Sequence, residues 1–95
     1  MKIPKSLQPV LWSVRIEELD LKEDKVYIIH QILSFGNLKE LRWLFRNYSI
    51  REVREVFLKY PLKVYRPQSF NFVNEILLKI RNKNLNMKKY VPPTL

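Results

Sequence analysis

Apolar positions recur at helical spacing in four stretches of this chain, and six prolines and one glycine separate these stretches. Apolar residues three and four positions apart line one face of an α-helix. Helices are therefore predicted over residues 21–35, 37–48, 49–60 and 69–81. A short helical turn is predicted over residues 4–14, with Trp12 as its anchor. The pattern predicts an all-α fold, a small bundle of four or five short helices.

Polar residues with the spacing of helix caps mark three of the predicted helix starts. The three pairs are Asp20 with Glu23, Asn37 with Glu40, and Ser49 with Glu52. In such a capping box, two side chains accept hydrogen bonds from backbone N–H groups that the first helical turn leaves unpaired. Gly36 is expected to end the first helix in the left-handed conformation.

The two middle helices follow each other almost without a linker, which is the pattern of a helix-turn-helix pair. Their expected core faces are Leu38, Leu41, Leu44, Phe45 and Tyr48 in the first helix, and Ile50, Val53, Val56, Phe57 and Tyr60 in the second. The expected core face of the last helix is Phe70, Val73, Ile76, Leu77 and Ile80.

The charge of the chain is strongly basic, with 18 Lys and Arg residues against nine Asp and Glu residues, a formal net charge of +9. This excess favours polyanions or acidic protein surfaces as partners. Biased codon usage in a chain without alanine is an alternative origin of the excess. We expect residues 1–81 to form a single helical domain and residues 82–95 to form a basic, flexible tail.

The residue types exclude most forms of catalysis. The chain has no cysteine, one histidine and one glycine, so it offers neither an activated nucleophile nor a phosphate-binding glycine loop. We expect a non-enzymatic protein with no cofactor and no metal site. The missing cysteines, signal peptide and long apolar run indicate a cytoplasmic protein that does not enter the membrane.

Five basic residues of the two middle helices are the candidate DNA-binding residues: Lys39, Arg42, Arg46, Arg51 and Arg54. In a helix-turn-helix, the second helix reads bases from its N-terminal part while the first crosses the phosphate backbone. Arg51 and Arg54 are thus the candidate base readers, and the other three are the candidate phosphate contacts. Basic solvent faces are also common on helices that never touch DNA, and that alternative stays open.

Three apolar residues lie off the predicted core faces: Trp43, Phe72 and Leu78. They indicate an apolar patch that binds a protein partner or a second copy of the chain. A homodimer would suit a small DNA-binding domain, because two half-site contacts bind more tightly than one. The alternative is that the N-terminal arm around residues 11–12 covers them.

Several short motifs also resemble a known family. They are Ile-Pro-Lys at 3–5, Leu-Trp-Ser at 11–13, Leu-Ser-Phe-Gly-Asn at 33–37, Arg-Trp-Leu-Phe at 42–45, and Arg-Pro-Gln-Ser at 66–69 before Phe72. Over residues 3–80 the chain resembles an uncharacterised family of short prokaryotic proteins. These resemble the small antitoxin-like partner of abortive-infection nucleotidyltransferase toxins. At Arg66, an acidic or small helix cap would be expected instead.

The sequence and the resemblance together favour an antitoxin-like or regulatory binding protein. It would contact DNA through the basic helix-turn-helix and a protein partner through the apolar patch. The resemblance implies that this partner is a nucleotidyltransferase-like toxin. Two alternatives remain open, namely a pure protein-interaction module and an RNA-binding accessory to a nucleotidyltransferase.

Overall fold

The computed structural model describes residues 3–81 and 84–93, and within them every regular element is helical. The four α-helices are α1 (Lys25–Phe35), α2 (Leu38–Asn47), α3 (Ile50–Lys59) and α4 (Pro67–Phe72). Single-turn elements are the 3₁₀ turns Lys5–Leu7, Ile16–Glu18 and Met87–Lys89 and the π-helical turn Val73–Leu77. The predicted all-α fold, a small bundle of short helices, is confirmed.

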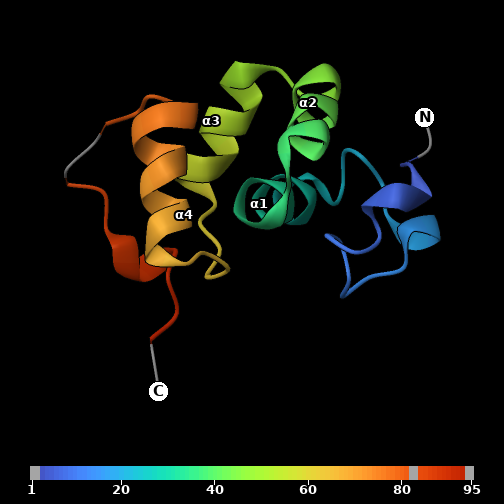
Figure 1. The fold of residues 1–95 in the computed structure, drawn as a ribbon, viewed down its shortest axis with the longest axis horizontal. Helices are drawn as coiled ribbons and strands as arrows, with labels where there is room; N and C mark the ends of the chain where they lie inside the picture. The colour runs from blue at the N-terminus through green and yellow to red at the C-terminus, as the bar shows by residue number, and fades with distance from the viewer. Residues whose placement is uncertain (1–2, 82–83, 94–95) are drawn as a thin grey trace.

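Helix α1 forms the centre of the fold and contacts α2, α3 and α4 (Figure 1). Its residues 28–33 are all buried, which requires neighbours on every side of the helix. The N-terminal segment packs on one side of α1 and contributes Leu7 and Leu11 to the same core. Helices α2 and α3 therefore share a common support although the turn between them is short.

The capping signals predict the start of two helices correctly and of one only in part. At α2 the Asn37 side chain accepts from the N–H of Glu40, and the Glu40 carboxylate accepts from the N–H of Asn37. At α3 the hydroxyl of Ser49 accepts from the N–H of Glu52. Residues 21–24, predicted as the first turn of α1, instead form a separate turn that Asp20 caps, and α1 begins at Lys25.

Gly36 ends α1 for a different reason from the one predicted. Its φ is −75° and its ψ is 149°, so the backbone is extended and not left-handed. A Cβ atom at this position would lie 2.6 Å from the carbonyl oxygen of Ile32. Glycine is thus required by the close approach of two backbone segments, and the expected left-handed cap is wrong.

The last helix changes its register after Phe72. A π-helical turn covers Val73–Leu77, and the N–H of Leu78 donates to the carbonyl of Val73 across 2.9 Å. The wider turn adds one residue, so Leu78 is fully buried whereas Ile76 is 61% exposed. The predictions that Ile76 is core and that Leu78 lies on a binding patch are both wrong.

The C-terminal segment packs into the core where it is described. Tyr90 is buried, its hydroxyl donates to the carbonyl of Phe57, and its carbonyl accepts from the N–H of Tyr65. Residues 84–93 are therefore part of the fold rather than the flexible tail that was expected. Residues 82, 83, 94 and 95 of that expected tail lie outside the described residues.

A histidine lies within this aromatic core. His30 makes two hydrogen bonds of 2.7 Å, from Nδ1 to the hydroxyl of Tyr65 and from Nε2 to the carbonyl of Tyr60. Because the carbonyl can only accept, Nε2 carries the proton and Nδ1 accepts from Tyr65. Burial lowers the pKa of His30 to about 4, although the hydrogen bonds to the Tyr60 and Val56 backbone act in the opposite direction.

No helix in the described part of the chain has the length and apolar character needed to cross a membrane.

Trp12, the predicted anchor of the N-terminal segment, is 57% exposed and packs edge-on against Phe35 with ring centroids 4.8 Å apart. Its neighbour in sequence, Leu11, is fully buried.

Candidate nucleic-acid interface

Three cations form a ridge along α2. Lys39, Arg42 and Arg46 are all exposed, and their spacing places them within about 60° of one another around the helix axis. The ion pairs among the described residues join Arg15 to Glu17 and Lys25 to Glu52, and neither pair includes a residue of this ridge. The α2 ridge therefore presents three positive charges to solvent without a carboxylate partner among the described residues.

The turn that joins α2 to α3 is short and fixed at both ends. Only Tyr48 and Ser49 separate the two helices. The Tyr48 side chain is buried, and its hydroxyl donates to the carbonyl of Leu21 across 2.6 Å. Burial raises the pKa of this hydroxyl, so Tyr48 stays neutral and acts as a fixed donor.

The two arginines of α3 differ in their surroundings. Arg51 is exposed in the first turn of the helix and makes no hydrogen bond to another described side chain. Arg54 is also exposed, but its Nε donates to the carbonyl of Leu78 across 2.9 Å. Arg54 therefore joins α3 to the end of the π-helical turn, and only its terminal amino groups remain for other contacts. Sequence reasoning missed this contact because it depends on the change of register.

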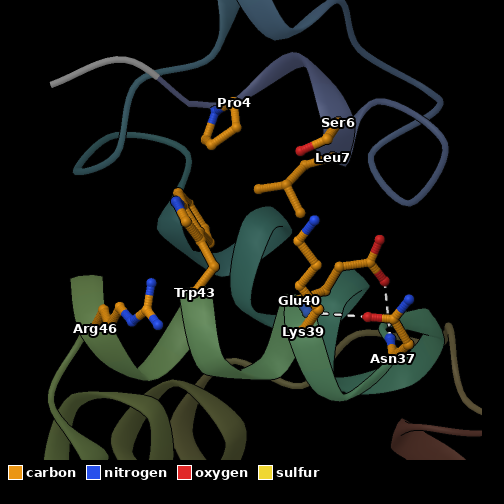
Figure 2. Close-up of a pocket in the computed structure, with 8 residues that line it drawn as sticks. All are labelled: Pro4, Ser6, Leu7, Asn37, Lys39, Glu40, Trp43 and Arg46. Carbon is orange, nitrogen blue, oxygen red and sulfur yellow. Dashed lines mark hydrogen bonds between the residues drawn. The ribbon is translucent and has the colours of Figure 1, made fainter.

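Trp43 faces the N-terminal segment rather than open solvent. Its half-buried side chain packs on the core and lines a hollow with Pro4, Leu7 and Lys39 (Figure 2). The prediction of Trp43 as a freely exposed patch residue is thus corrected, because residues 4–7 form the opposite wall of this hollow. Residues 11–12, which the alternative named as the cover, do not line it.

A second, mainly apolar hollow lies between α2 and the π-helical turn. Its lining residues are Leu38, Leu41, Arg42, Phe45, Arg46 and Leu77, around a volume of about 340 Å³. Leu38 is 65% exposed, so its predicted place in the core is wrong. As the first residue of α2, Leu38 lines this open hollow instead.

Phe72 lies in a neighbouring hollow of about 260 Å³ between α1, α2 and α4. Leu41 lines both hollows, which makes them adjacent. We name the combined surface of Leu38, Leu41, Phe45, Phe72 and Leu77 the apolar groove. Of the three predicted patch residues, only Phe72 therefore belongs to an open apolar surface.

The described residues include no cluster of three or more His, Cys, Asp or Glu side chains that could hold a metal ion. The buried histidine is fully occupied by two hydrogen bonds inside the core. The described surface carries four features, namely the α2 ridge, the start of α3, the Trp43 hollow and the apolar groove. Such an arrangement can bind and orient partners.

A family model matches part of this chain. The model of a family of unknown function, DUF6922, matches residues 7–57, just over half of the chain. The match covers α1, α2 and most of α3, and it includes all five candidate DNA-binding residues. Neither the curated proteins nor the solved structures contain a match to this chain.

Proposed function

We propose that this chain, which belongs to the DUF6922 family, is a non-enzymatic cytoplasmic protein that binds DNA through α2 and α3. The observation that carries the proposal is the α2 ridge, with three exposed cations that have no carboxylate partner among the described residues. Cations on a rigid helix bind phosphates and release counterions, which is the main source of affinity for DNA.

The helix arrangement supports the same proposal. Helices α2 and α3 are joined by two residues and both pack on α1, so their relative orientation is fixed before any partner binds. In a helix-turn-helix, the first helix contacts phosphates and the N-terminal side chains of the second reach base edges. The α2 ridge would then contact phosphates, and Arg51 would read bases.

Arg54 takes a different role in this proposal from the one expected from sequence. Its hydrogen bond to the carbonyl of Leu78 restricts the guanidinium, so base reading falls to Arg51. We assign Arg54 as a positioning residue that fixes the angle of α3 and contributes a phosphate contact through its free amino groups.

A protein partner is the second part of the proposal, and the apolar groove supports it. Leu38 and Phe72 are both exposed there, and Arg42 and Arg46 flank it. The antitoxin-like resemblance supplies a candidate partner, a nucleotidyltransferase-like toxin, and a second copy of the chain is the other. If the α2 ridge served only this partner, the chain would be a pure protein-interaction module.

Fluorescence anisotropy with labelled duplexes tests the DNA contact. One duplex carries the sequence upstream of the protein's own gene and the other a scrambled sequence. Arg51→Ala should remove a preference of about 1–3 kcal/mol for the native duplex. Arg42→Ala should weaken binding to both duplexes and reduce the salt slope by about one.

Lys88→Gln is the matched control, because Lys88 is an exposed lysine of the Met87–Lys89 turn, away from α2 (Figure 1). It removes one positive charge but no proposed contact, so it should leave the native preference unchanged. If Lys88→Gln and Arg42→Ala weakened binding equally, the attraction would be generic and the interface proposal would fail.

A further inference from the structure

The hollow around Trp43 combines apolar walls with cations, in a volume of about 310 Å³. Pro4, Ser6 and Leu7 of the N-terminal segment form one wall (Figure 2). The opposite wall is α2, from its cap to its last turn. A volume of this size lies at the lower end of the range for small-molecule sites, roughly 300–1,000 Å³.

Three side chains follow one another along the α2 wall in the order Lys39, Trp43 and Arg46. They are four and three residues apart, so they share one face of the helix over a length of roughly 10 Å. The Trp43 indole rises from α2 toward Pro4, between the two cations (Figure 2). The order cation, ring, cation corresponds to the order phosphate, base, phosphate along a nucleic-acid strand.

One carboxylate lines the hollow, that of Glu40, and its position is fixed. Its Oε1 accepts from the N–H of Asn37 across 2.8 Å as part of the α2 capping box. Figure 2 shows Glu40 beside Lys39 and Asn37, at the opposite end of the hollow from Arg46. The end beside Trp43 and Arg46 is therefore the more positive one.

We infer that this hollow binds an unstacked base of single-stranded nucleic acid, with Trp43 as the stacking surface and Lys39 and Arg46 as contacts to the flanking phosphates. Basic grooves with exposed aromatic rings bind single strands in this way, because every base has a face that can stack. The inference rests on the proposed function in one respect, the use of α2 cations as phosphate contacts. It adds a site for unpaired bases that a duplex cannot fill.

The two tryptophans of the chain allow a direct measurement. Trp12→Phe leaves Trp43 as the only tryptophan, and Trp12 is exposed and outside the hollow. Octathymidylate and octauridylate are titrated separately into this variant while indole emission is recorded. Base stacking on Trp43 predicts saturable quenching, and comparison of the two oligomers distinguishes DNA from RNA as the source of the strand.

Four further variants in the Trp12→Phe background locate the contact. Lys39→Gln and Arg46→Gln should each weaken binding several-fold, whereas Lys88→Gln should leave it unchanged. Trp43→Leu should weaken octamer binding by roughly 5- to 150-fold, measured by anisotropy of a labelled octamer. Circular dichroism shows whether Trp43→Leu retains its helices, and if it unfolds, the two glutamine variants decide the result.

The outcomes separate this inference from the proposed function. Duplex binding through Arg51 without saturable quenching by either octamer overturns the inference and leaves the proposed function standing. Octamer binding that depends on Lys39 and Arg46, in a protein with no affinity for duplex, supports the inference and overturns the proposed function. Quenching that Lys39→Gln and Lys88→Gln reduce equally also overturns the inference, because it reflects net charge alone.

Discussion

Acidification should destabilise this fold through His30. The folded protein keeps His30 neutral with a pKa of about 4, whereas the unfolded chain has the ordinary value of about 6.5. Between these two pH values the unfolded chain binds a proton that the folded protein excludes. The stabilising contribution is therefore complete above the unfolded pKa and is lost as the pH falls toward the folded one. The free energy of unfolding should fall by about 2 kcal/mol from about pH 7.5 to about pH 5.

Urea unfolding, followed by circular dichroism across this pH range, measures the effect. The chain has one histidine, so His30 is the one imidazole that can make the free energy of unfolding depend on pH in this range. Backbone hydrogen bonds from Glu23 and Lys22 lower the pKa of Asp20, which moves its titration below the range of the experiment. His30→Gln should be less stable at neutral pH, but its free energy of unfolding should no longer fall between about pH 7.5 and about pH 5. A free energy of unfolding that is constant across the range, or a slope that persists in His30→Gln, would refute the reasoning.

The register and packing findings give three further predictions, each measured by thermal or urea unfolding. Leu78→Ala should cost about 2–5 kcal/mol because the side chain is fully buried, whereas exposed Ile76→Ala should cost less than about 0.5 kcal/mol; equal effects would contradict the π-helical turn. Tyr90→Phe should cost about 1–3 kcal/mol by leaving a buried carbonyl without its donor, and no change would mean that residues 84–93 are not packed. Gly36→Ala should be destabilising by about 1–3 kcal/mol through its contact with backbone, and a neutral result would contradict the close approach.

The sequence predicts those parts of the fold that depend on local chemistry. The cap at Asn37 and the cap at Ser49 satisfy backbone donors within one turn, so their spacing is sufficient to place the starts of α2 and α3. The exposure of Lys39, Arg42 and Arg46 also follows from helical period alone.

Features that depend on distant contacts were not predictable in this way. Helical period assumes a regular α-helix, and the π-helical turn adds a residue that moves burial from Ile76 to Leu78. The same shift places the Leu78 carbonyl where Arg54 can donate to it. Tyr90 has no periodic pattern around it, and its burial depends on contacts with Phe57 and Tyr65 that only the folded chain creates.

The candidate site shows the same division. Periodicity indicated the α2 ridge and the start of α3, but it could not show that residues 4–7 form a hollow with Trp43. The apolar groove was missed because helical spacing assigns Leu38 to the core face, whereas the folded chain leaves it 65% exposed. The α2 ridge lies beside the Trp43 hollow and the apolar groove only in the folded chain, so the sequence could not place them together.

Chemical-shift mapping tests the central claim, that α2 and α3 form a DNA-binding surface, most directly. Amide resonances of the ¹⁵N-labelled protein are recorded while the native upstream duplex is added at physiological salt. We expect shifts to be concentrated in residues 38–54 and largest near the α2 ridge and Arg51, with residues 84–93 unchanged. Shifts spread evenly over all lysine- and arginine-bearing segments, or no shifts in α2 and α3, would show that α2 and α3 are not the DNA-binding surface.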